Sequence, residues 1–141
     1  MGFSKRDSLI SLQEKKGIIE YATIYNDESY ESMKFLIDIK NIFSRQLPKM
    51  PKEYIVRMVF DRNHKCLLIL KNKTMVVGGI CYRLFPENHF AEIVFLAITP
   101  KEQIKGFGTR LMNHFKEKMR IEKIRFLMTY ADNYAVGRVF W

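Results

Sequence analysis

A single carboxylate inside an apolar segment is the first group in this sequence that could do chemistry. Glu92 lies within Phe90–Ile98, where every other residue is apolar. The segment is predicted to be a buried strand, and alternation along a strand places Glu92, Val94 and Leu96 on one face. Burial would disfavour the charged carboxylate and raise its pKa toward the range that suits a general base. The simpler alternative is a strand-edge carboxylate that reaches water or pairs with a cation such as Arg83.

A glycine turn follows this strand and forms the second candidate group. The segment Gln103–Thr109 contains Gly106 and Gly108 and leads into a predicted amphipathic helix at 109–120. Unpaired N–H groups and the positive end of the helix dipole attract anions, and glycines let the backbone approach them closely. With Lys105 in the turn, this pattern is typical of a phosphate cradle. It has neither a Walker sequence nor the third glycine of a dinucleotide fingerprint, so an ordinary strand-to-helix turn is the alternative.

A third candidate is the tyrosine-containing segment Thr129–Tyr134, at the end of a predicted strand. A tyrosine hydroxyl there could donate a hydrogen bond to a leaving group, while core packing is the alternative. The histidines indicate no Ser-His-Asp or Cys-His arrangement, and His64 and His89 lie in predicted turns. Cys66 and Cys81 lack CxxC spacing and a nearby histidine pair, so we expect reduced core thiols and no metal site.

Hydrophobic periodicity predicts the elements that position these groups. Strands are predicted at 17–25, 66–71, 74–85, 90–99 and 124–130, and helices at 30–47, 52–61 and 109–120. Short turns join the three central strands, which favours an antiparallel meander, whereas the helical crossover to the last strand favours a parallel pair. Gly78 and Gly79 within one strand suggest a bulge or a close backbone approach. The predicted fold class is therefore α+β, with a mixed, mostly antiparallel sheet and flanking helices.

Length and composition fit one globular domain, with 141 residues of which 48% are apolar and 28% charged. No apolar run reaches the roughly 18 residues of a membrane span, so no membrane partner is expected. The net charge of +9 favours anionic partners such as phosphates or nucleic acid, and a solvated basic surface is the simpler alternative. The lysines and arginines are scattered, however, so charge alone does not predict a nucleic-acid-binding module. Residues 1–16 are polar and charged, and we expect a loose or marginally helical arm.

Taken in order, these features form one pattern. A meander leads to an apolar strand with a glutamate, followed by Gln-x-x-Gly-x-Gly-Thr, a helix and a further strand. The segments that carry the pattern are Leu47–Ile55, Val76–Ile80, Phe90–Phe95, Leu111–His114 and Thr129–Ala135. The pattern resembles the GNAT acetyltransferase superfamily, and most closely its nuclear histone acetyltransferase branch, the PCAF-type enzymes. The resemblance extends from about Gly17 to Gly137, and the combination of motifs is specific although each motif alone is not.

The resemblance implies a lysine acetyltransferase that transfers acetyl from acetyl-coenzyme A to a histone tail, with histone H3 as the expected substrate. It gives Glu92 the role of general base, and it implies no metal. The implied cofactor-binding residues are the strand backbone at Leu96, Ala97 and Ile98, the pyrophosphate loop of Gln103, Ile104, Lys105, Gly106, Phe107, Gly108 and Thr109, and Tyr134 near the sulfur.

The resemblance also implies a nuclear protein with coactivator-complex subunits as partners and no sequence-specific contact to nucleic acid. The family domain normally continues past the last residue of this chain, so 17–141 is expected to be an incomplete GNAT domain without its C-terminal strands. The main alternative is accordingly a catalytically impaired coenzyme A-binding module of a chromatin complex. A GNAT enzyme for a small amine or another protein, and a basic nucleic-acid-binding domain, are weaker alternatives.

Overall fold

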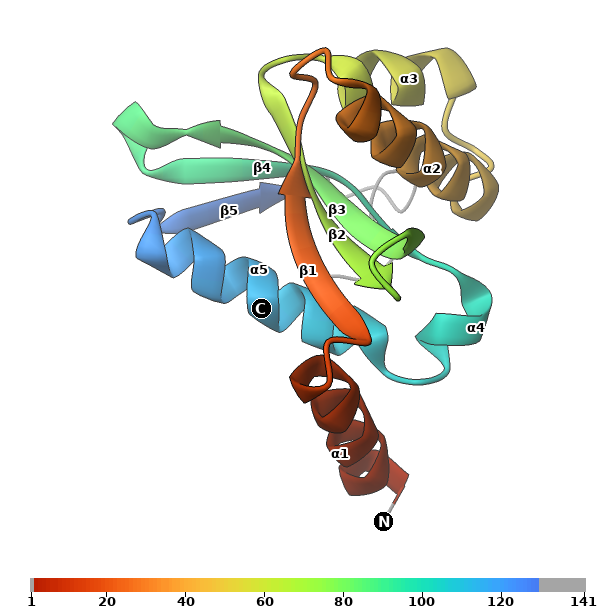
Figure 1. Ribbon diagram of the computed structural model, residues 1–141. Coiled ribbons are helices and arrows are strands. Elements are labelled where there is room, and N and C mark those ends of the chain that lie inside the picture. Colours follow the sequence, from red (N-terminus) through yellow and green to blue (C-terminus); the bar gives the residue numbers. More distant parts are fainter. Residues whose placement is uncertain (1, 130–141) are drawn as a thin grey trace.

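A sheet, five-stranded over residues 2–129, forms the centre of the molecule (Figure 1). The structure, a computed structural model, describes residues 2–129, with side chains from Ser8 onward. The strands are β1 Ile19–Ile24, β2 His64–Lys71, β3 Met75–Phe85, β4 Phe90–Ile98 and β5 Phe126–Thr129, and they lie in this order across the sheet. β1 to β4 pair antiparallel, and β4 pairs with β5 in parallel. The predicted mixed, mostly antiparallel sheet is therefore confirmed.

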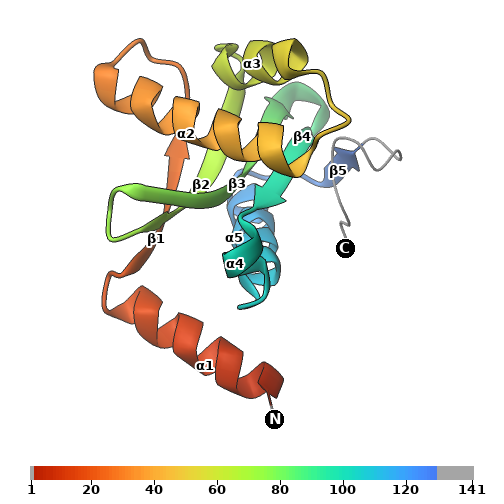
Figure 2. The same ribbon diagram turned by 90° about the vertical axis from the view of Figure 1, so that its right-hand side faces the viewer.

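Helices cover both faces of this sheet. They are α1 Gly2–Lys15, α2 Tyr30–Gln46, α3 Lys52–Phe60, the single turn α4 Pro100–Gln103 and α5 Phe107–Ile121, with a 3-10 turn η1 at Pro86–Asn88. α2 and α3 lie on one side of the sheet and α5 on the other (Figures 1 and 2). α1, in the segment predicted to be a loose or marginally helical arm, is a helix that extends away from the start of β1 (Figure 2). Within the described range, no helix is long and apolar enough to cross a membrane.

Local sequence sets the boundaries of α2. The Ser29 hydroxyl caps the first turn by accepting a hydrogen bond from the Ser32 N–H at 3.2 Å. The helix ends at Gln46, just before Leu47 and Pro48, since the residue before a proline is disfavoured in the α region. Its apolar face buries Leu36, Ile39, Ile42 and Phe43. Each such side chain contributes about 1.5–3 kcal/mol on burial, so packing on the sheet stabilises α2 more than helix propensity does.

The sheet separates two hydrophobic cores. On one side, which we call the α5 core, Ile80 and Ile93 of the sheet pack with Leu111 and Phe115 of α5. On the other side, which we call the α2–α3 core, the fully buried residues include Leu36, Ile39, Ile55, Leu68 and Phe95. β4 contributes side chains to both cores, so its position is fixed from both sides.

Close backbone approach explains the two glycines in β3. A Cβ at Gly78 would lie 2.9 Å from the carbonyl oxygen of Ala97 in β4, and a Cβ at Gly79 would lie 2.9 Å from the carbonyl oxygen of Leu67 in β2. A bulge lies directly beside them, where the β2–β3 register leaves Val77 without a partner. The predicted bulge and the predicted close approach are both confirmed.

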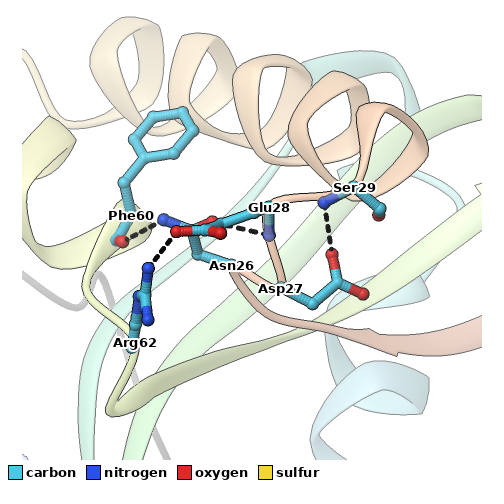
Figure 3. Close-up of polar contacts among 6 residues, drawn as sticks. All are labelled: Asn26, Asp27, Glu28, Ser29, Phe60 and Arg62. Carbon is cyan, nitrogen blue, oxygen red and sulfur yellow. Dashed lines mark hydrogen bonds and ion pairs between the residues drawn. The ribbon is translucent and has the colours of Figure 1, made fainter.

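The polar loop at 26–29, between β1 and α2, contacts the end of α3 (Figure 3). Asn26 Nδ2 donates a hydrogen bond to the carbonyl oxygen of Phe60, the last residue of α3, at 2.8 Å. Glu28 forms an ion pair with Arg62 in the turn that follows α3. These contacts hold the turn from which β2 begins, and β2 carries a residue of the candidate site.

Candidate active site

A β-bulge in β4 sets the geometry of the candidate site. Cys81 of β3 faces Phe95 of β4, and Tyr82 faces Ile93, so Val94 is an extra residue without a register partner. A bulge bends the strand and increases its local twist. The two halves of β4 consequently have opposite side-chain alternation.

The side chains of β4 change faces at this bulge. Ala91 and Ile93, before the bulge, belong to the α5 core, and Leu96, after it, packs against the same core. Val94 belongs to the α2–α3 core. The expectation that Glu92, Val94 and Leu96 share one face is therefore wrong for Leu96. Simple alternation fails here because the inserted residue shifts the phase of everything that follows it.

Glu92 is half-buried on the α2–α3 side of the sheet, because its neighbours Ala91 and Ile93 point to the other side. It faces Arg83 of β3 and Met128 of β5 in direct register. The predicted strand acid thus lies inside the sheet, with a strand on each side, and two residues before the bulge. It has apolar surroundings on the strand itself and one cation on the neighbouring strand.

A buried histidine continues this row across the sheet. His64 begins β2 and faces Arg83, so His64, Arg83 and Glu92 lie side by side on three neighbouring strands. His64 is 5% exposed, and its Nδ1 lies 2.6 Å from Asp61 Oδ2. This hydrogen bond holds the pKa of Asp61 below its ordinary value, with a smaller contribution from the Arg83 guanidinium.

The sequence prediction that His64 lies in a turn is wrong. The residue is the first of a strand, and its ring is buried. Two signals could have identified it. Asp61 lies three residues earlier, within reach of the ring, and the apolar run of β2 begins two residues after His64, at Cys66.

The glycine loop leads into a helix as predicted, although α5 begins at Phe107 and not at Thr109. Gly106 has φ 90° and ψ 16°, the left-handed conformation that favours glycine. Among the described residues no side chain caps α5, and its first turn holds no acidic residue. The first N–H groups of a helix have no intrahelical acceptor, and a Cβ at Gly108 would meet open space. The start of α5 can therefore accept an anion.

Other residues of the predicted pyrophosphate loop have supporting contacts. Gln103 Nε2 donates to the carbonyl oxygen of Ile98 at 2.6 Å and to Gln46 Oε1 at 3.4 Å. These bonds brace the loop against the ends of β4 and α2. The Phe107 side chain is buried in the α5 core, whereas Ile104 is 76% exposed. The loop is thus held to the core by Phe107, while the first N–H groups of α5 have no side-chain cap among the described residues.

The second half of β4 has one unpaired edge in the described part of the chain. Leu96, Ala97 and Ile98 are in register with β3, whereas β5 pairs with β4 only as far as Ile93. Strands rise about 3.3 Å per residue, so about 20 Å separate Glu92 from Ile98. An extended molecule along this edge would reach from the glycine loop to the candidate base.

The remaining predicted groups are Tyr134 and the two cysteines. Tyr134 lies outside the described residues. Cys66 and Cys81 are buried free cysteines that face each other across β2 and β3, as predicted for reduced core thiols. Burial raises the pKa of the Cys81 thiol well above its ordinary value. Among the described side chains, no group of three His, Cys, Asp or Glu could hold a metal ion.

The fold and the site together define the class of protein. Residues 30–140 match the Acetyltransferase (GNAT) family, and the chain belongs to this family. Its predicted membership and fold are thereby confirmed. The chain is 48% identical over 136 residues to "Histone acetyltransferase GCN5" of Debaryomyces hansenii, covering 96% of this chain and 30% of that protein. It is also 48% identical over 136 residues to the protein of the same name from Oryza sativa subsp. japonica, covering 96% of this chain and 26% of that protein.

Solved structures show the same likeness. The crystal structure of Tetrahymena GCN5 has a TM-score of 0.79 and 58% identity, covering 84% of this chain and 74% of that one. The catalytic domain of Tetrahymena GCN5 in complex with coenzyme A has a TM-score of 0.70 and 56% identity, covering 83% and 70%. The chain spans about 30% of the length, or less, of the curated relatives it matches.

Proposed function

We propose that this chain is the catalytic part of an acetyl-coenzyme A-dependent histone lysine acetyltransferase. The observation that carries the proposal is the arrangement along β4, with a half-buried glutamate before the bulge and an uncapped helix start after the strand. The names of the similar proteins add the substrate class, since they are histone acetyltransferases. The coenzyme A complex of the Tetrahymena structure adds the cofactor.

The residues present suit coenzyme A. The diphosphate is expected to bind the N–H groups at the start of α5, where Gly106 turns the chain and Gly108 leaves room for a close approach. The pantetheine arm would run along the β4 edge at Leu96, Ala97 and Ile98, which has no strand partner among residues 2–129. We also include Tyr134 among the cofactor contacts, by resemblance to the family.

The reaction requires a neutral amine, and this requirement defines the role of Glu92. A lysine has a pKa of about 10.4, so at neutral pH its side chain is almost entirely ammonium and cannot attack a carbonyl carbon. In the proposal, Glu92 takes this proton through a water molecule. Acetyl-coenzyme A supplies the thioester. The amine nitrogen bonds to the acetyl carbon, the carbon–sulfur bond breaks, and the nitrogen loses a second proton. A water or a nearby hydroxyl passes one proton on to the departing thiolate.

Both substrates react directly in this scheme, without an acetylated cysteine. Cys81 is fully buried, and the raised pKa of its thiol disfavours the nucleophilic thiolate. Negative charge that develops on the acetyl oxygen needs a hydrogen-bond donor. A backbone N–H among Leu96, Ala97 and Ile98 is the proposed donor, because the β4 edge has no strand partner there in the described part of the chain.

Glu92→Gln tests the base. We expect the rate of acetyl transfer to a histone H3 tail peptide to fall by about 10²–10⁴-fold, with affinity for coenzyme A nearly unchanged. Glu87→Gln, an exposed glutamate in η1, removes the same charge and is the control. Equal rates for wild type and Glu92→Gln would remove Glu92 from the role. A wild-type chain that binds coenzyme A but transfers nothing would favour the impaired binding module.

The remaining parts of the proposal are what the resemblance to the family implies. They are a preference for the histone H3 tail, partners in a coactivator complex, a nuclear location and a catalytic domain at 17–141. A panel of histone peptides, small amines and other lysine-containing peptides tests the substrate. A small amine acetylated faster than every histone peptide would replace histones as the substrate class.

A further inference from the structure

We propose that Glu102 is a positioning residue for the cofactor loop, whose buried carboxylate holds Lys71 and Lys105 beside the start of α5. Glu102 lies in α4, one turn before Gly106. The inference rests on the proposed function, because it concerns how this loop binds coenzyme A. It assigns a role to a carboxylate that the acetyl-transfer chemistry does not use.

Glu102 is unusual for its burial. It is 4% exposed, and it is the one buried acidic residue among the described side chains. A carboxylate is costly to remove from water unless it is paired or hydrogen-bonded. α4 is only four residues long and exposes Lys101 and Gln103, so helix packing alone does not require an acid at this position.

Two lysines from different parts of the chain pair with this carboxylate. Lys71 Nζ lies 3.9 Å from Glu102 Oε1, and Lys105 Nζ lies 3.4 Å from Oε2. Lys71 is the last residue of β2, while Lys105 belongs to the glycine loop itself. The Lys105 N–H also donates to the Glu102 carbonyl oxygen at 3.1 Å, and the Glu102 N–H to that of Thr99 at 3.0 Å. Glu102 therefore connects the sheet to the loop through both side chain and backbone.

The charge of Glu102 is the wrong sign for a neighbour of a diphosphate. Two lysines and one glutamate leave a net charge of +1 at the loop, whereas the two lysines alone would give +2. By charge alone, neutralising Glu102 should strengthen the binding of an anion. By positioning, neutralising it should weaken binding, because two long side chains lose the contact that orders them. The two explanations therefore predict opposite changes in the affinity for coenzyme A when Glu102 is neutralised.

Glu102→Gln is the decisive variant. We expect the KM for acetyl-coenzyme A and the dissociation constant for coenzyme A to rise roughly tenfold, a loss on the order of one buried charged interaction, with kcat within about twofold. The KM for the histone peptide should not change. Glu117→Gln on α5 is the matched control, since it removes an equal charge from an exposed pair with Arg120. Tighter or unchanged binding by Glu102→Gln would overturn the proposal.

Glu102→Asp covers the case in which Glu102→Gln does not fold, as judged by circular dichroism. The aspartate keeps the charge but withdraws the carboxylate by one methylene. Charge alone predicts unchanged binding of coenzyme A, while positioning predicts binding weakened several-fold. A variant with a lower melting temperature and an unchanged KM would reduce Glu102 to a structural residue and overturn the positioning role. Failure of wild type to bind coenzyme A would instead overturn the proposed function itself.

Discussion

At the residue scale, the candidate base belongs to a row of polar side chains that crosses three strands. Glu92 faces Arg83, Arg83 faces His64, and His64 is hydrogen-bonded to Asp61. The Arg83 guanidinium carbon also lies 4.8 Å from the centre of the Phe85 ring, a cation–π arrangement that restrains it. The row places the Arg83 cation on the strand position next to Glu92, the proposed base.

The Asp61–His64 pair predicts a specific loss of stability in acid. The pKa of Asp61 is lowered in the folded state, chiefly by its hydrogen bond to His64. Its stabilising contribution is therefore present above its ordinary pKa of 3.8 and is lost as the pH falls through the lowered folded value. We expect Asp61→Asn to melt at a lower temperature than wild type at pH 5 to 7, with a gap that narrows below about pH 4. A gap that does not depend on pH would contradict this assignment.

At this scale, the sequence predicts the candidate catalytic side chain better than it predicts which side chains pair with one another. Glu92 was identified because an acid in an apolar run is conspicuous. The pairing of Glu102 with Lys71 could not be predicted, because the two residues are distant in sequence and meet only where β2 ends beside the glycine loop. His64 was missed for a different reason, since its position directly after a turn conceals its place in the strand.

At the element scale, the neighbouring strands and the two cores fix the position of β4. It pairs with β3 in antiparallel fashion and with β5 in parallel fashion, and each side-chain face packs into a different core. β3 approaches β4 so closely at Gly78 that there is no space for a side chain. The path of β4 past the bulge, and with it the proposed cofactor edge, depends on this glycine.

Gly78→Ala tests that dependence. The new Cβ would lie 2.9 Å from the carbonyl oxygen of Ala97 and 3.0 Å from the Cα of Ile98, both of which are backbone atoms. We expect a loss of about 1–3 kcal/mol in the free energy of unfolding, measured with urea. Gly108→Ala is the control, because its Cβ meets open space and alanine favours a helix. It should leave the free energy unchanged or raise it by up to about 1 kcal/mol. Equal effects of the two substitutions would contradict the close approach.

Strong periodicity explains why most elements could be predicted from sequence. The meander of β2 to β4 and the helices α2, α3 and α5 each have a long apolar pattern and clear turn residues at their ends. The bulge at Val94 could not be predicted, because one inserted residue in the apolar run from Ile93 to Ile98 leaves no visible break in the pattern. α4 was missed because a single helical turn has no periodicity to detect.

At the scale of the whole molecule, Glu14 of α1 connects three elements. Its carboxylate accepts hydrogen bonds from Tyr21 of β1 and Arg110 of α5, and His114 Nε2 lies 3.6 Å away. The Tyr21 and His114 rings stack with centroids 3.6 Å apart. Burial and the bond to Glu14 raise the pKa of the Tyr21 hydroxyl. α1 is thus attached to the helix whose start forms the proposed phosphate site.

Glu14→Gln tests the attachment of α1. We expect a loss of about 1–3 kcal/mol in stability, because the Arg110 guanidinium would lose a charged acceptor in a partly buried position. Glu28→Gln removes an exposed ion pair with Arg62 and should cost less than about 1 kcal/mol. Urea unfolding of both variants provides the comparison. A larger effect at Glu28 would contradict the role assigned to Glu14.

The extra residue in β4 also bears on how this segment can change in length. Surface loops usually accept insertions and deletions, since their ends can adjust. Gain or loss of one amino acid near Val94 would instead move every later side chain of the strand to the opposite face of the sheet. Leu96 and Ile98 would then enter the α2–α3 core, and Phe95 and Ala97 would enter the α5 core. Both cores would then receive side chains of the wrong size. We therefore expect insertions and deletions near Val94 to be tolerated as poorly as changes of residue type.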